Sequence, residues 1–202
     1  MTIFEPIAIY RKLYMKFKKP KTSNIILLVV ITLFIIPQTR QPIQIALHSV
    51  LSKFGPSVID KEDQKTVSYA SWKLRDLEGN EINYNETKDK VVFINLWATW
   101  CPPCIAEFQG IQDLYNDYKD DVVFLLVSDE APETIQIFLD KKGYNVPVFN
   151  PLTNYPKDFE GRSIPRTYII DKEGHVVVDK KGVANWNSDK MRNELDELLK
   201  GS

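Results

Sequence analysis

The hydrophobic pattern of this chain begins with an uninterrupted apolar run near its start. Residues 22–39 contain no charged residue, and residues 25–36 are almost all aliphatic. A helix of this length would span roughly 27 Å, which is about the thickness of the hydrocarbon core of a bilayer. We therefore expect residues 22–39 to form a transmembrane helix. A helix buried in a protein core is the alternative for so short a run.

A connector separates this apolar run from the rest of the chain. Residues 40–65 are punctuated by Pro42 and Pro56, and their charges gather at 61–65. Between the two prolines, apolar residues recur at helical spacing, which predicts a juxtamembrane helix. These residues are Ile43, Leu47, Val50, Leu51 and Phe54. We expect the folded domain to occupy residues 66–202.

Within that domain, runs typical of buried strands alternate with apolar stripes at helical spacing. The run Val91–Trp97 is the clearest strand, because a strand covered on both faces is apolar throughout. The expected strands are 68–77, 81–84, 91–97, 122–128, 148–149, 164–171 and 175–179, and the expected helices are 102–118, 132–143, a short one at 155–159 and a last one capped by Ser188. The alternation implies parallel βαβ units. We expect an α/β sandwich with a core of four or five strands and helices on both faces.

Charge changes this picture mainly at the N-terminus. The formal net charge is −1, which gives no reason to expect nucleic acid as a partner. Residues 1–21, however, carry six Lys or Arg residues and one acid. A basic flank before an apolar run places the N-terminus in the cytoplasm. We expect a cytoplasmic segment at 1–21 and a catalytic domain outside the membrane. No small-residue cleavage site follows the run, which favours a retained signal anchor over a cleaved signal peptide.

The chain has two cysteines, and both lie in the motif Cys101-Pro102-Pro103-Cys104. The motif follows the strand 91–97 and opens the helix 102–118, where prolines are tolerated because the first N–H groups lack intrahelical partners. The positive end of a helix favours a thiolate. We expect Cys101 at an exposed tip, where it attacks a target disulfide. Cys104 faces inward and resolves the mixed disulfide.

Other roles for two cysteines at this spacing are half of a zinc site, a structural staple or coincidence. Zinc usually takes four ligands, and the chain adds only His48 and His175, both far from the motif. A disulfide closing so short a loop removes little entropy from the unfolded chain. These points favour redox chemistry, with no metal and no cofactor.

At this point the chain resembles a known family. The stretch N-L-W-A-T-W-C-P-P-C at residues 95–104 is similar to the thioredoxin superfamily, and within it to the membrane-anchored TlpA/ResA/CcmG-like thiol-disulfide oxidoreductases of bacteria. The resemblance covers about residues 65–200. It implies a thioredoxin-like three-layer sandwich with a central mixed sheet and an N-terminal β-hairpin extension, here the strands 68–77 and 81–84.

The resemblance also implies a substrate-binding surface. Ile164-Pro165 stands where thioredoxin-like proteins place a cis-proline opposite the cysteines, and an ordinary trans-proline at an edge strand is the alternative. Trp100 is expected to line the same surface. Arg166 follows where many relatives have threonine; it could lower the pKa of Cys101, select an acidic partner or point to water.

Two positions differ from typical thioredoxins. The buried aspartate that accepts a proton from the second cysteine in thioredoxins is replaced by Asn95, which cannot take that proton. ResA-like proteins have a glutamate three residues after the second cysteine, and Glu107 occupies that place. Cys104 and Glu107 would share a helix face, although a solvated glutamate is also consistent with the sequence. Pro102 removes one N–H group, which leaves mainly the Cys104 N–H to stabilise a Cys101 thiolate.

The combined interpretation is a protein-disulfide reductase in the bacterial cytoplasmic membrane, with one membrane span and a periplasmic catalytic domain. The resemblance suggests a membrane electron donor of the CcdA/DsbD type and substrates such as apocytochrome c. The alternatives are a disulfide-forming oxidase of the DsbA type, a peroxiredoxin-like peroxidase and a membrane-tethered binding module without catalysis. The intact Cys101, Cys104 and Pro165 argue against the last of these.

Overall fold

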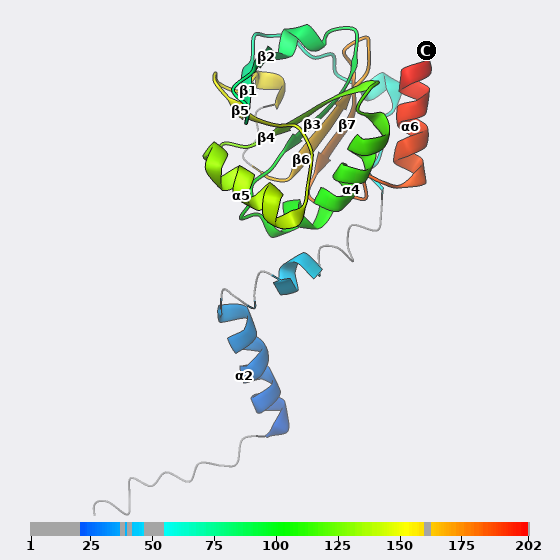
Figure 1. Cartoon of the computed structure of the whole chain (residues 1–202). Coiled ribbons are helices and arrows are strands. Elements are labelled where there is room, and N and C mark those ends of the chain that lie inside the picture. Colours follow the sequence, from blue (N-terminus) through cyan, green and yellow to red (C-terminus); the bar gives the residue numbers. More distant parts are fainter. Residues whose placement is uncertain (1–20, 37–38, 40–41, 47–54, 160–162, 202) are drawn as a thin grey trace, which may run out of the picture. The chain divides into compact units, whose positions relative to one another are not determined.

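A computed structural model describes residues 21–36, 39, 42–46, 55–159 and 163–201. The chain divides into two compact units, residues 1–41 and 42–202, which we describe separately (Figure 1). In the first unit, helix α2 (Thr22–Ile35) is built from uncharged residues, and most of its aliphatic side chains are exposed. Within the described ranges, no helix has both the length and the apolar character needed to cross a membrane. The basic segment expected at 1–21 lies outside them, apart from Lys21.

The second unit is built around one mixed sheet. Its seven strands lie in the order β2-β1-β5-β4-β3-β6-β7. Their bounds are β1 Lys73–Asp76, β2 Glu81–Asn83, β3 Val91–Leu96, β4 Val122–Val127, β5 Val148–Pro151, β6 Arg166–Ile170 and β7 Val176–Lys181. Strands β3, β4 and β5 run parallel, and the other pairs are antiparallel. The predicted hairpin is confirmed as β1–β2, and the pairing of β1 with β5 makes it part of the sheet.

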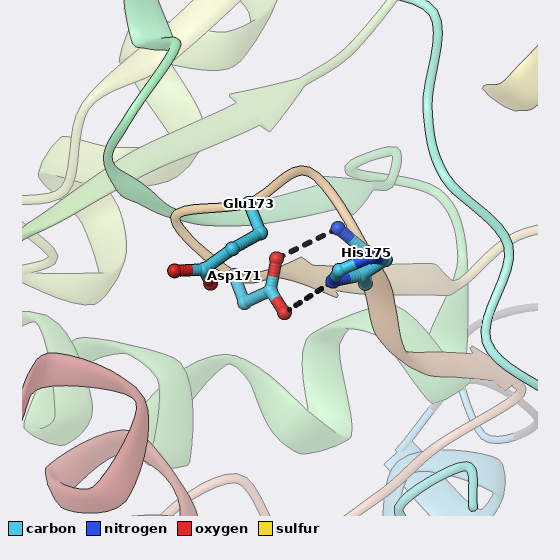
Figure 2. Close-up of side chains that lie close together, drawn as sticks. All are labelled: Asp171, Glu173 and His175. Atoms are coloured by element: carbon cyan, nitrogen blue, oxygen red, sulfur yellow. Dashed lines mark hydrogen bonds and ion pairs between the residues drawn. The ribbon is translucent and has the colours of Figure 1, made fainter. Parts of the chain in front are cut away.

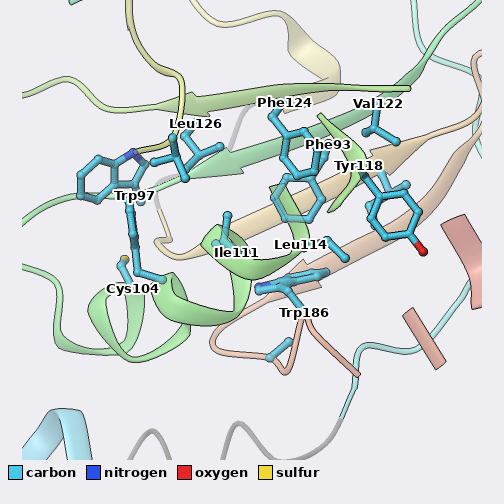
Figure 3. Packing of buried hydrophobic residues seen from close by; sticks show 14 of the residues in the cluster. Phe93, Trp97, Cys104, Ile111, Leu114, Tyr118, Val122, Phe124, Leu126 and Trp186 are labelled. Atoms are coloured by element: carbon cyan, nitrogen blue, oxygen red, sulfur yellow. The ribbon is translucent and has the colours of Figure 1, made fainter. Parts of the chain in front are cut away.

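Three α-helices pack on one face of this sheet. They are α4 (Pro102–Tyr118), α5 (Pro132–Lys142) and α6 (Asp189–Lys200). Their apolar residues form one cluster with Phe93 of β3 and the buried Trp186, and Figure 3 shows part of this packing. As predicted, Ser188 caps α6, since its hydroxyl accepts a hydrogen bond from the Met191 N–H.

The opposite face differs from our expectation of helices on both sides. Val92 and Ile94 of β3 point into a second cluster, and among the described residues this cluster is covered by 3₁₀ helices, η2 (Tyr84–Thr87) and η3 (Lys157–Phe159), and by extended chain. The connections β3-α4-β4 and β4-α5-β5 step in the same direction across the sheet. Right-handed crossovers therefore put α4 and α5 on the same face. In the described part of the domain, the prediction of helices on both faces therefore holds only for short 3₁₀ helices on this face, one of which, η3, lies within the short helix expected at 155–159.

Aromatic rings take the place of a helix on the second face. Trp72, Tyr84 and Phe159 are fully buried, with ring centroids 5.1–6.3 Å apart. Aromatic pairs at such distances contribute about 0.5–1.5 kcal/mol each beyond the area that they bury. The sheet thus has a helical face, which carries the cysteines, and an aromatic face.

The turn between β6 and β7 brings together Asp171, Glu173 and His175 (Figure 2). Asp171 Oδ1 accepts the His175 N–H at 2.7 Å, and Asp171 Oδ2 lies 2.9 Å from His175 Nδ1. The aspartate therefore satisfies the backbone of a tight turn, a common role for this residue type. The turn follows Ile170, whereas the opposite end of β6 pairs with the strand end that leads to the cysteines.

Candidate active site

The two cysteines lie where β3 passes into α4. The Trp97 N–H still bonds to the Val127 carbonyl, beyond the end of β3. Cys101 is the N-cap of α4, Pro102 and Pro103 open the helix, and Cys104 lies in its first turn. Cys101 and Cys104 form a disulfide with Cα atoms 5.3 Å apart. The Cys104 nitrogen lies 3.3 Å from Cys101 Sγ and donates its N–H to it; this is the main donor that the sequence led us to expect.

The expected exposure of Cys101 is not found. Cys101 is 3% exposed and Cys104 is 1% exposed, and both belong to the apolar cluster under the helices. Trp100 occupies the tip instead, with 66% of its surface exposed. The physical reason is that Cys101 is apolar and its N–H bonds to the carbonyl of the buried Ala98, so it packs in the same cluster as Trp97 and Ala98. In the disulfide form a partner meets Trp100 before it meets the sulfur.

The proline ahead of β6 lies beside this strand end, as the resemblance implied. The Ile164–Pro165 peptide bond is cis, and Pro165 is buried. Arg166, the next residue, pairs with Leu96 at the end of β3. The half-buried Ile164 contacts both apolar clusters.

Arg166 points to a different place from the other predicted substrate-binding residues. Its guanidinium forms two hydrogen bonds of 2.9 Å to Asp179, and it stacks over the Tyr168 ring with its central carbon 4.9 Å from the centroid. The bonds to Asp179 raise the pKa of the guanidinium. Arg166 lines a hollow with Lys65, separate from the groove that Trp100 and Ile164 line. The structure thus brings Trp100 and Ile164 together, without Arg166.

Glu107 lies deep inside the domain, with 2% of its surface exposed. Three groups donate hydrogen bonds to its carboxylate: Asn95 Nδ2 at 3.1 Å, the Ala184 N–H at 3.1 Å and Trp186 Nε1 at 2.9 Å. Burial raises the pKa of Glu107 to about 7, because its effect is larger than that of these three hydrogen bonds, which lower the pKa. Such a carboxyl group can take up or release a proton near neutral pH. The alternative of a solvated glutamate is wrong.

Asn95 connects this carboxylate to the cis-proline strand. Its amide nitrogen donates to Glu107 and, at 2.8 Å, to Thr167 Oγ1, while Asn95 Oδ1 has no partner among the described residues. The residue that replaces the thioredoxin aspartate therefore holds the glutamate. The bond from Trp186 could not be found from the sequence, because 79 positions separate it from Glu107.

A groove of about 770 Å³ lies beside Trp100. Its wall includes Trp97, Trp100, Tyr155, Ile164, Asp129 and Glu130. Glu130 holds the loop before Cys101: its carboxylate accepts the Thr99 N–H at 2.5 Å and the Thr99 hydroxyl at 2.7 Å. The sequence analysis missed Glu130 and Tyr155, since neither belongs to a motif.

Known proteins resemble the part of the chain that carries this site. The AhpC/TSA family profile matches residues 67–179. Thiol-disulfide oxidoreductase ResA of Halalkalibacterium halodurans is 35% identical over 130 residues, which are 63% of this chain and 72% of that protein. Thioredoxin-like protein YneN of Bacillus subtilis is 28% identical, over 61% of this chain and 74% of its own length.

Solved structures extend the likeness to the fold. A thiol:disulfide interchange protein of the thioredoxin family from Chlorobium tepidum superposes with a TM-score of 0.54, at 20% identity, over 67% of this chain and 99% of its own. At that identity the likeness concerns the fold alone. The fold is thioredoxin-like, with a mixed sheet.

Proposed function

The chain belongs to the AhpC/TSA family, and from this premise we propose that it is a thiol-disulfide oxidoreductase that reduces disulfides in other proteins. The observation that carries the proposal is the Cys101–Cys104 pair at the mouth of α4, with the Cys104 N–H directed at Cys101 Sγ. Its relatives ResA and YneN are named as a thiol-disulfide oxidoreductase and a thioredoxin-like protein.

The reaction begins with the reduced dithiol. The Cys101 thiolate attacks one sulfur of a substrate disulfide, that S–S bond breaks, and the leaving thiolate takes up a proton. The Cys104 thiol loses its proton and attacks Cys101 Sγ. The mixed disulfide breaks, the second substrate thiol leaves, and the Cys101–Cys104 disulfide forms. Two electrons pass from the enzyme to the substrate, and a separate thiol donor must return them.

Glu107 is our candidate for the group that accepts the proton of Cys104. It lies one turn after Cys104 on α4, is buried with it, and has a pKa raised to about 7. An acceptor with a pKa near ambient pH is half ionised and therefore effective in both directions. Asn95 and Trp186 hold the carboxylate through their hydrogen bonds.

The cellular setting belongs to the same proposal. The basic residues 1–21 and the uncharged run 22–39 support a single-pass anchor with its N-terminus in the cytoplasm. The domain 66–202 then acts outside the cytoplasmic membrane. A CcdA/DsbD-type donor would reduce it, and apocytochrome c, whose cysteines must be reduced before haem attachment, is the substrate that the resemblance suggests.

Trapping tests the chemistry. In a Cys104→Ser variant, the mixed disulfide between Cys101 and a substrate cannot be resolved, so we expect it to accumulate as a species sensitive to reductant on non-reducing gels. The matched Cys101→Ser variant should give no such species. Equal trapping by both variants would mean that Cys101 is not the specific attacking cysteine. No trapping by either variant would overturn the proposal.

The reduction potential tests the direction of the reaction. We expect the Cys101–Cys104 couple to equilibrate near the thioredoxin value of about −270 mV or lower, which suits a reductase. A value near about −120 mV, as in DsbA, would instead identify a disulfide-forming oxidase. Equilibration against glutathione or thioredoxin couples, read by thiol alkylation, gives the value.

A further inference from the structure

The groove beside Trp100 carries negative charge at its wall. Asp129 and Glu130 lie just after β4, beyond Ser128, and both line the groove. They also line an adjoining hollow together with Asp76. We call the groove lined by Trp97, Trp100, Tyr155, Ile164, Asp129 and Glu130 the acidic groove. No Lys or Arg is among its described lining residues.

The partners of the two carboxylates within the described chain are neutral. Asp129 accepts the Tyr155 hydroxyl at 2.9 Å, and Glu130 accepts the N–H and the hydroxyl of Thr99. Arg75 lines the adjoining hollow, but it pairs with Glu81 at 2.6 Å. Two negative charges at the groove therefore have no ion-pair partner among the described residues.

The other walls suit a polypeptide side chain. Trp100 is largely exposed, and the rings of Trp100 and Tyr155 can both face a cation, which aromatic faces attract. Trp97 lines the same groove, and its buried indole N–H has no acceptor within the described residues.

We propose that the acidic groove determines substrate specificity by binding a Lys or Arg side chain of a substrate polypeptide, close to the cysteine that Cys101 attacks. The inference rests on the proposed oxidoreductase function and adds the substrate class to it. The position of the groove supports it, because Ala98 and Trp100 of the loop before Cys101 line one wall and Ile164 of the cis-proline segment lines another.

Charge complementarity of this kind acts mainly on the rate of association and on the choice of partner. A carboxylate and a cation about 7 Å apart in water attract enough to change a rate by about threefold. When a glutamate replaces the lysine in the substrate, the attraction to each of the two carboxylates becomes a repulsion, which slows association instead of speeding it. The expected preference is therefore about tenfold or more at low ionic strength, and salt should reduce it.

The test uses the reduced full-length chain in a neutral detergent and two peptides that differ at one position. Each peptide carries one cysteine as a 2-pyridyl disulfide, flanked by Lys in one peptide and by Glu in the other. Attack by Cys101 on the peptide sulfur releases pyridine-2-thione, and its absorbance gives the second-order rate constant. We expect the Lys peptide to react about tenfold faster or more at low salt.

Variants locate the effect. Asp129→Asn keeps an oxygen for the Tyr155 hydroxyl and removes one charge, so the Lys/Glu rate ratio should fall severalfold. Asp129→Lys should lower the ratio further. Asp120→Asn is the matched control, because this exposed aspartate precedes β4 at its other end and its removal should leave the ratio unchanged.

The outcomes separate this inference from the proposed function. If both peptides react at the same rate, or if Asp129→Asn leaves the ratio unchanged, the acidic groove does not select cations although the enzyme is active. If neither peptide reacts with the reduced chain, the proposed oxidoreductase function fails, and this inference fails with it.

Discussion

At the scale of the residue, the most informative group is Glu107. Burial raises its pKa from 4.5 to about 7 in the folded protein, so the folded state holds this proton more tightly than the unfolded chain does. The free energy of unfolding therefore loses a contribution as pH rises from 4.5 to about 7. Below that window the carboxyl is neutral in both states, and the contribution is fully present.

A Glu107→Gln variant removes this titration. We compare the free energy of unfolding of the variant with that of the wild type at each pH. The variant minus wild-type difference should rise by about 3 kcal/mol from the lower to the upper end of this pH window, because only the wild type loses stability there. Urea unfolding of both disulfide-bonded proteins across the range measures the change. Taking the difference cancels the other groups, and the exposed Glu62→Gln provides a control that should stay level. A level difference for Glu107→Gln would mean that the pKa of Glu107 is not raised.

The prolines after Cys101 give a second prediction for single residues. A cap side chain accepts hydrogen bonds from the second and third helical N–H groups, and here Pro103 removes the first of these two donors. Pro103→Ala restores it, so we expect the pKa of the Cys101 thiol to fall by about half a unit, in line with about 0.3–1 kcal/mol for an anion at a helix terminus. Alkylation rates of the reduced protein against pH measure this pKa. An unchanged or higher pKa would show that the restored N–H does not reach the sulfur.

At the scale of the element, helix α4 contains one glycine that its backbone does not require. A Cβ at Gly110 would meet the Asn187 nitrogen at 3.6 Å and the Trp186 nitrogen at 3.7 Å, which are ordinary van der Waals contacts. Gly110→Ala should stabilise the domain by about 0.5–1 kcal/mol, because glycine is unfavourable inside a helix. Urea unfolding measures it.

Gly143 is the contrasting case for the same measurement. It ends α5 with a φ of +70°, a conformation that strains other residues. Gly143→Ala should therefore destabilise the domain by about 1 kcal/mol. If both substitutions destabilised, the contacts of α4 with residues 186–187 would be tighter than these distances indicate.

The elements also show how far a sequence pattern can predict a fold. The run Val91–Trp97 and the stripe after Cys104 predicted β3 and α4 closely, because one is buried on both sides and the other on one side. The sheet is wider than predicted, since β5 joins the hairpin to the core through pairs that no periodicity encodes. The side on which α5 packs follows from strand order, which was not predicted.

At the scale of the whole molecule, the site could be predicted only where a local motif marks it. The cysteine pair and the cis-proline lie in short motifs, and Glu107 follows from its spacing to Cys104. The donors to Glu107 from residues 184 and 186, and the contact of Glu130 with Thr99, join positions 77, 79 and 31 apart. Such contacts depend on the folded chain. Cys101 was predicted to be exposed because a strand-to-helix turn usually lies at a surface, and here it packs into the apolar cluster with Trp97 and Ala98 instead.

The start of the folded domain leads to the last prediction. The Ile59 N–H bonds to the Val177 carbonyl at 2.8 Å, and the Val176 N–H bonds to the Lys65 carbonyl at 2.8 Å. This segment therefore lies along the edge strand β7, and it ends at the buried Val67, whose N–H bonds to the Gly174 carbonyl. Without it, the edge of β7 and part of the aromatic face would be exposed.

Two truncations measure the contribution of this segment. A chain that starts at residue 55 should fold, whereas a chain that starts at residue 68 should be about 3–5 kcal/mol less stable, from the lost hydrogen bonds and the buried valine. Urea unfolding of both disulfide-bonded chains gives the difference. Since the cysteines lie on the opposite face and at the other end of the sheet, the potential of the Cys101–Cys104 couple should be the same in both. Equal stabilities would mean that residues 55–67 rest on the domain without supporting it.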